Sequence, residues 1–166
     1  MNVQFYMEKL SLSEKFKNFM KDNKDAYLCS GFFVIDKNPK NPDNKQHFDY
    51  YVPSSKKMFS FQLEEGIKRV PLDIINKEVP EKILKPEFDF NEIEKIIEKE
   101  MERRDIKNKI QKIMLSLQNF NKKDFLICTV FISMLGILKV KIDLSTEEVT
   151  EFEKKSFFDI MKVKRG

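Results

Sequence analysis

The sequence predicts an α+β domain in which one or two antiparallel sheets are covered by helices and the chain is built from two α-β-β-β halves. Three observations lead to this class: one strongly apolar stretch, two regions of alternating apolar and polar residues, and an amphipathic helical pattern before each region. The length of 166 residues suits a single compact domain, 1–166. Its halves, 11–63 and 91–161, would be joined by a wrapping segment, 64–90, which prolines interrupt.

The most apolar stretch of the chain, 124–138, is predicted to be a central strand of the sheet. It includes the β-branched and aromatic residues Thr129, Val130, Phe131 and Ile132, which favour a strand over a helix. Its apolar side chains would lie on both faces, as in an interior strand. The stretch is too short to span a bilayer, so no membrane span is expected.

The first half begins with an amphipathic helix that starts at Ser11 or Ser13. From Ser11 the chain reads Ser-Leu-Ser-Glu, a capping box in which the two end side chains bond free backbone N–H groups. An apolar stripe at helical spacing consists of Leu12, Phe16, Phe19 and Met20. We expect the helix to end near 22–25, a strand at 26–35, and a long exposed loop at 36–44, because this loop holds two prolines and many turn-forming residues.

A β-hairpin is predicted at 46–63, where apolar and polar residues alternate on both sides of the turn 53–56. The alternation places four aromatic side chains on one face of this hairpin: Phe48, Tyr50, Phe59 and Phe61. This aromatic face has two interpretations. It lines a cavity for an apolar small ligand, or it is the core under the first helix.

The joining segment, 64–90, contains Pro71, Pro80 and Pro86 between short apolar groups. Proline disfavours helix and interior strand, so we expect an extended segment with at most one short strand. Its apolar residues predict that it lies on the core.

The second half opens with a long helix that starts at Asp89 or Asn91 and runs to about Asn119. Its apolar stripe changes direction at 102–105, so either the helix breaks there or one straight helix uses its two parts against different neighbours. A second hairpin follows the central strand, with its strands at 138–142 and 149–154. The apolar tail Phe157–Met161 should pack on the body, and 162–166 should fray.

An internal echo suggests that the halves arose by duplication. Residues 23–33 align with 122–132 at a constant offset of 99, with Lys, Asp, Cys and Phe identical in both copies. A helix precedes each copy and a hairpin follows it. Cys29 and Cys128 would then occupy equivalent central strands, where we expect them to be buried and reduced; a disulfide between them is the alternative.

The second hairpin, Leu138-Lys-Val-Lys-Ile-Asp-Leu-Ser-Thr-Glu-Glu-Val-Thr-Glu-Phe-Glu153, resembles the last hairpin of PepSY-type modules. In that family a strand ending in Ile-Asp, a short Thr-Gly-type turn and a Glu-Val strand recur. This chain departs from the pattern with Glu147 where glycine is usual, and it lacks the family's common export signal. The resemblance implies a helix packed across an antiparallel sheet and a role in binding or restraining another protein. It implies no catalytic residues.

Other candidate chemical groups have structural interpretations that outweigh catalytic ones. His47 and Asp49 share a strand face but have no nucleophile of defined geometry beside them. A helical stripe of glutamates, Glu94, Glu98 and Glu102, alternates with basic residues as a solvated face does. The four glycines are isolated, so they form no phosphate-binding loop. We therefore predict no catalytic residue, no metal site and no cofactor.

Charge and targeting patterns bound the function. The net charge of +4 comes from 31 basic and 27 acidic residues that are interspersed, and this pattern disfavours nucleic acid as a partner. No secretion signal is visible at the N-terminus, so a cytoplasmic location is expected. The leading hypothesis is a non-enzymatic intracellular protein-interaction or regulatory module whose partner is another protein or a second copy of the chain. The alternatives are an apolar-ligand module that uses the aromatic face and a weakly basic nucleic-acid-binding module.

Overall fold

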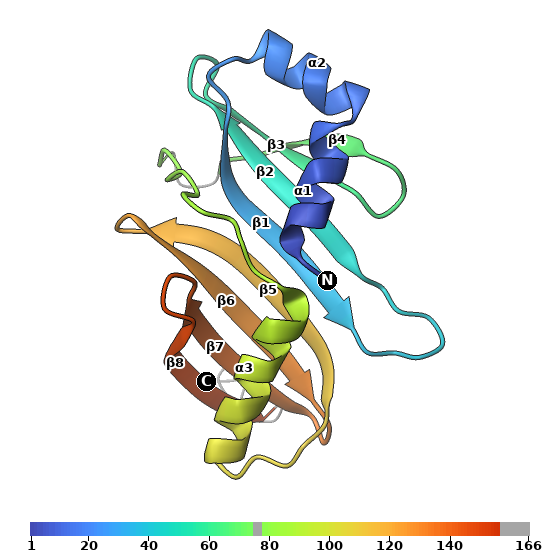
Figure 1. The fold of residues 1–166 in the computed structure, drawn as a ribbon, viewed down its shortest axis with the longest axis vertical. Coiled ribbons are helices and arrows are strands. Elements are labelled where there is room, and N and C mark those ends of the chain that lie inside the picture. The colour runs from blue at the N-terminus through green and yellow to red at the C-terminus, as the bar shows by residue number, and fades with distance from the viewer. Residues whose placement is uncertain (75–77, 157–166) are drawn as a thin grey trace, which may run out of the picture.

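A computed structural model describes residues 1–74 and 78–156 of the chain. Within these residues the chain forms three helices and a single antiparallel sheet of eight strands. The strand order is β4-β3-β2-β1-β5-β6-β7-β8, so each half contributes four sequential strands, and the halves meet where β1 pairs with β5 (Figure 1). The elements are α1 (Val3–Ser11), α2 (Glu14–Asp22), β1 (Tyr27–Asp36), β2 (Lys45–Val52), β3 (Lys57–Gln62), β4 (Lys68–Leu72), α3 (Phe90–Arg103), β5 (Ile110–Phe120), β6 (Lys123–Ile132), β7 (Gly136–Asp143) and β8 (Glu148–Ser156).

The α+β class with an antiparallel sheet is correct, but the predicted content of the halves is not. The observed order is α-α-β-β-β-β followed by α-β-β-β-β. The fourth strand of the first half, β4, lies within the segment predicted to wrap, and it is the one short strand that its composition allowed. The second half also has one strand more than predicted. This additional strand is β5, the first strand after α3, which the sequence patterns placed in a helix.

The first half contains two short helices instead of one. α1 starts after Asn2, whose side chain accepts a hydrogen bond from the backbone N–H of Gln4. Ser13 caps α2 by accepting from the N–H of Phe16, so the second of the two predicted start points is correct. Leu12 follows α1 and is 71% exposed, so its place on the predicted apolar stripe is wrong.

The second helix prediction was wrong beyond Arg103, where α3 ends. Asp89 caps the start as expected, and Asp105 at the end adopts a left-handed backbone with φ of 56°. Residues Ile110–Phe120 form β5, in which the buried Ile113, Leu115 and Leu117 alternate with half-buried residues as in a strand. The two neighbouring strands, β1 and β6, supply the pairing that favours the extended form.

The apolar stretch 124–138 is an interior strand, but it is not continuous. β6 lies between β5 and β7, as the composition predicted. It ends at Ile132, and the chain reverses before β7 begins at Gly136. The middle of the sheet is the β1–β5 pair and not this strand.

The internal echo does not align equivalent strands. Its two copies fall on β1, the first strand after the helices of the first half, and on β6, the second strand after α3. Cys29 and Cys128 therefore lie on strands that β5 separates, and both are buried and free. Their predicted equivalence is wrong, whereas their burial is confirmed. The tail 157–166, for which packing of Phe157–Met161 and fraying of 162–166 were predicted, lies outside the described residues.

The two faces of the sheet differ in burial. One face is buried over the inner strands and joins the helices in a single core, with side chains of 0% exposure that include Phe33, Phe48, Phe61, Leu115, Leu117, Leu126, Val130 and Leu138. Figure 1 shows the three helices on the viewer's side of the sheet. We call the opposite side the open face, because no helix of the described chain lies on it (Figure 1).

An extended stretch between β4 and α3 holds the halves together. The backbone N–H of Ile83 donates to the carbonyl of Leu28 on β1 at 2.9 Å. The next two N–H groups, of Leu84 and Lys85, donate to the carboxylate of Asp124 on β6 at 3.1 and 2.6 Å. Ile83 itself is 3% exposed. This stretch is therefore bonded to both halves at adjacent residues.

Candidate functional site

The aromatic set predicted as an alternative ligand site packs under α2. Phe48 and Phe61 have no exposed surface, and Tyr50 is 8% exposed. The ring of Phe19 on α2 lies 5.1 Å from Phe61, 5.5 Å from Phe59 and 6.3 Å from Tyr50. The edge-to-face geometry of these rings is that of a packed aromatic core. The structure thus places all four residues on the buried face.

The two residues of the candidate acid–base pair, His47 and Asp49, each bind a different partner. His47 Nε2 pairs with Glu64 Oε1, whereas Asp49 Oδ2 accepts from Ser30 Oγ at 2.7 Å. Of the glutamate stripe, Glu94 pairs with Lys37 at 2.6 Å. In residues 1–74 and 78–156 no cluster of three His, Cys, Asp or Glu side chains has metal-binding geometry. The structure brings none of these predicted groups together.

The two cysteines are buried in different surroundings. Desolvation raises the pKa of the Cys29 thiol to about 12, and the nearby Asp49 carboxylate adds to this rise. Burial alone raises the pKa of the Cys128 thiol. Both thiols therefore stay protonated at neutral pH, and the protonated form is a poor nucleophile.

We expect neither cysteine of the native protein to react with a disulfide reagent such as Ellman's reagent at neutral pH, because both thiols are protonated and buried. Unfolding in guanidinium should release both for rapid labelling. The measurement is the labelling time course with and without denaturant, and Cys29→Ala and Cys128→Ala variants assign the two signals. Fast labelling of either thiol in the native protein would contradict the prediction.

The open face carries half-buried apolar side chains among polar and basic ones. The half-buried members include Phe32, Met114, Ile127, Phe131 and Ile137. The strand register gives the rows that cross β5, β6 and β7: Lys112–Phe131–Ile137, Met114–Thr129–Lys139 and Ser116–Ile127–Lys141. Apolar and basic groups therefore alternate over the second half of this face.

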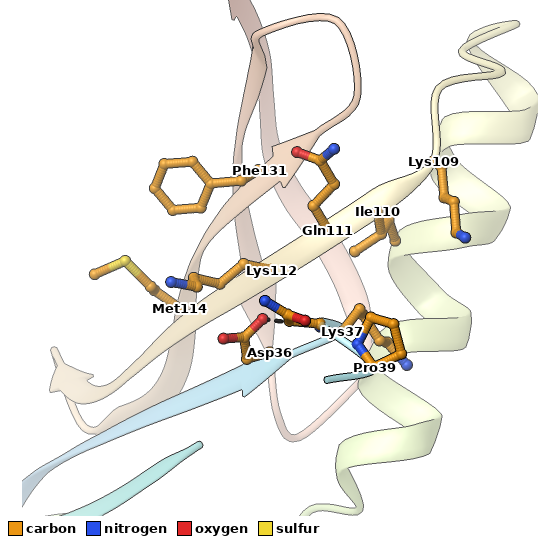
Figure 2. Close-up of a pocket in the computed structure, with 10 residues that line it drawn as sticks. Asp36, Lys37, Pro39, Lys109, Ile110, Gln111, Lys112, Met114 and Phe131 are labelled. Carbon is orange, nitrogen blue, oxygen red and sulfur yellow. Dashed lines mark hydrogen bonds between the residues drawn. The ribbon is translucent and has the colours of Figure 1, made fainter. Parts of the chain in front are cut away.

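A shallow hollow of about 600 Å³ lies at one end of the open face, where the two halves meet (Figure 2). Lys112, Met114 and Phe131 project on the same side of the sheet (Figure 2). Its remaining lining residues are Asp36, Lys37, Asn38, Pro39, Lys109, Ile110 and Gln111. Five of the ten are exposed and only Ile110 is buried, so the hollow is open to the surroundings.

Asp36 fixes the loop that forms one wall of the hollow. Its carboxylate accepts from the backbone N–H groups of Asp43 at 2.9 Å and Asn38 at 3.0 Å. These bonds, with a smaller contribution from the Lys112 ammonium across the strand pair, lower the pKa of Asp36. The carboxylate is therefore ionised at neutral pH and holds the loop closed on itself.

Of the three lysines that line the hollow, Lys37 pairs with Glu94, whereas the other two have no ion pair within the described residues. In the part of the chain that the structure describes, neither Lys109 nor Lys112 has a carboxylate oxygen within 4.0 Å. The other basic group, Lys122–Lys123, lies at the far end of β5, about 30 Å away at about 3.3 Å per residue. Lys139 and Lys141 lie between these two groups on the open face, so its basic residues are spaced among apolar ones.

Sequence reasoning missed Lys112, Met114 and Phe131 as surface neighbours. Lys112 and Met114 were placed in a helix, so their side of the sheet was not assigned. Phe131 was assigned to an interior strand with two apolar faces. The alternation of Ile113, Leu115 and Leu117 was the available signal, because it leaves Lys112 and Met114 together on the opposite face.

Comparison with known proteins gives little to extend this description. No protein-family model matches the chain, and no curated protein matches it. Among solved structures, the chain is similar to a protein described as a candidate lipoprotein from Clostridium difficile 630, with a TM-score of 0.45 and 11% sequence identity. The likeness covers 86% of this chain and 91% of that one. At this score the likeness carries no argument about fold or function. No helix of the described residues is long and apolar enough to cross a membrane.

Proposed function

We propose that the chain is a non-enzymatic interaction module that binds another protein on the open face, at the hollow between its halves. The observation that carries this proposal is the combination of half-buried Met114 and Phe131 with two lysines, Lys109 and Lys112, that lack ion pairs among the described residues. Apolar side chains on an uncovered sheet face are typical of protein contact surfaces. The occupant would be a protein segment that offers apolar side chains next to an acidic residue.

A protein partner fits the hollow better than a small apolar ligand. Ligand pockets bury most of the ligand's surface, typically about 70–90%. Half of the residues that line this hollow are themselves exposed, so a small molecule would remain largely in water. The ligand hypothesis required the aromatic face of the first hairpin to be free, but Phe16 and Phe19 of α2 pack against it.

The test is an affinity capture from native lysate with the wild-type chain and a Phe131→Thr/Met114→Thr double variant as baits. Threonine keeps the strand preference while removing the apolar surface. We expect the wild type to retain a protein that the double variant releases. With that protein purified, the double variant should weaken Kd by roughly tenfold or more, the usual effect of losing central apolar contacts.

Met58→Thr is the matched control, because Met58 is a half-buried residue on the open face of the first half, on β3. It should capture the partner as the wild type does. Equal retention by the double variant would overturn the proposed surface. If no protein is retained and native mass spectrometry detects an apolar small molecule, the ligand-binding alternative replaces this one.

The broader assignments form part of the same proposal. The resemblance of 138–153, the β7–β8 hairpin, to PepSY-type modules supports a binding or restraining role. The strand order, four and four about the β1–β5 pair, supports an origin by duplication with β1 equivalent to β5. The two free cysteines support a reducing, cytoplasmic location. The nucleic-acid alternative requires basic residues concentrated on one face, and the interspersed 31 basic and 27 acidic residues disfavour it.

A further inference from the structure

The β6–β7 reversal presents two apolar side chains at its tip. Met134 is 88% exposed and Leu135 is 57% exposed. Both adopt a left-handed backbone, with φ of 64° and 59°. Asparagine and glycine are the residues that accept this conformation readily, whereas methionine and leucine are strained in it. Met134 and Leu135 are therefore unfavourable at these positions for two reasons: their apolar side chains are exposed to water, and their backbone is left-handed.

The tip is held rigidly in place. Ser133 bonds Lys109 twice: its N–H donates to the Lys109 carbonyl at 2.8 Å, and its Oγ accepts from the Lys109 N–H at 2.9 Å. Asn108 Nδ2 donates to the Ser133 carbonyl at 2.9 Å. A Cβ on Gly136 would lie 2.6 Å from Ile132 Cγ1, so the close reversal requires glycine there. The apolar tip is therefore a preformed projection.

Basic residues lie near this projection. Lys109, whose backbone is bonded to the tip, is exposed and directly precedes β5, and Lys112 lies on β5. Lys107, which is also exposed, pairs with Asp105 at 3.8 Å. β8 ends beside the tip, since Ser156 pairs with Gly136. The apolar tip therefore lies close to cationic residues of the described chain.

We infer that this end of the protein docks on an anionic lipid surface, with Met134 and Leu135 inserted at the headgroup boundary and the lysines on the lipid phosphates and carboxylates. A convex apolar tip needs no matching recess in a lipid interface, whereas a protein partner would have to supply one. Basic residues close to an anionic bilayer add attraction that salt weakens. This inference shares Lys109 and Lys112 with the proposed protein contact at the hollow, but its apolar contacts are Met134 and Leu135 instead of Met114 and Phe131.

The first experiment is co-sedimentation of the full chain with vesicles of phosphatidylcholine alone and with vesicles that also contain phosphatidylserine. We expect binding to the anionic vesicles only, and it should weaken as salt is raised. A Met134→Asn/Leu135→Gly variant should bind roughly tenfold less while its Tm stays equal or rises, because Asn and Gly suit the left-handed positions. Asn121→Gly is the control, because it changes a left-handed residue in the reversal at the opposite end of β6 without changing charge, and its binding should equal that of the wild type.

The second experiment uses the absence of tryptophan from the sequence. A Leu135→Trp variant carries one reporter at the tip, and its emission should shift to the blue when anionic vesicles are added. Phe5→Trp, at a residue of α1 with 55% exposure, is the matched control and should not shift. Three results would each overturn the inference. The wild-type chain could fail to bind anionic vesicles, the tip variants could bind as the wild type does, or both tryptophans could show equal emission shifts. The capture experiment at the hollow can succeed or fail independently of these results.

Discussion

Replacing Phe19 by alanine is expected to lower the free energy of unfolding by about 3–5 kcal/mol, the range for deleting a fully buried aromatic side chain. Phe19 is 1% exposed and contacts four other aromatic rings across the junction of α2 with the sheet. The guanidinium of Arg69 also lies 5.8 Å from its ring centre. Equilibrium unfolding in urea, followed by circular dichroism, measures the change.

Leu12→Ala is the matched control for this prediction. Leu12 lies just before α2 and is 71% exposed, so its loss should change stability by less than about 0.5 kcal/mol. The pair of variants tests whether the aromatic face is core or binding site. If Phe19→Ala left stability unchanged, α2 would not be packed on Phe59 and Phe61, and the aromatic face would again be a candidate ligand site.

Replacing Asp124 by alanine is expected to lower the free energy of unfolding by about 3 kcal/mol or more, because it removes the acceptor of three hydrogen bonds at once. Its carboxylate accepts from the N–H groups of Leu84 and Lys85 and from Asn119 Nδ2 at 2.8 Å. Asp124 and Asn119 are each 8% exposed, so water cannot replace all of these bonds. Urea unfolding gives the magnitude, and hydrogen exchange at Leu84 and Lys85 locates the effect.

Two further variants provide reference values for the loss of stability in Asp124→Ala. Asp124→Asn keeps one acceptor oxygen but turns an NH₂ group toward donors, so it should fall between the wild type and the alanine variant. Glu153→Gln removes the charge of an exposed carboxylate that pairs with Lys155, and it should be nearly neutral. An alanine variant as stable as Glu153→Gln would show that Asp124 does not hold the joining stretch.

Local patterns predicted the elements whose partners are close in sequence. The hairpins β2–β3 and β7–β8 were found because apolar alternation and turn residues lie within one short window. The capping residues Ser13 and Asp89 marked helix starts for the same reason. Each of these features is decided by interactions among residues only a few positions apart.

The elements that were missed depend on distant partners. Residues Ile110–Phe120 satisfy both the helical and the strand period, and pairing with β1 decides between them. The echo was misleading because it compared composition within strands and not their position in the sheet. The hollow combines residues of β1, β5 and β6, so it could not be assembled until those three strands were known to be adjacent.

The strand order also has a consequence for folding kinetics. Within each half, every strand pairs with its neighbour in sequence, so each half can form through short loop closures. Among the strands that the structure describes, only β1 and β5 are paired although distant in the chain, and their pairing requires the first strand of each half to be in place. We therefore expect docking of the two halves along this seam to be the slow step, with variants at Phe33 or Leu115 slowing refolding more than variants at Val149 on the β8 edge. The hollow, which spans the same seam, would then form last, and a chain caught before docking would have two structured halves and no binding surface.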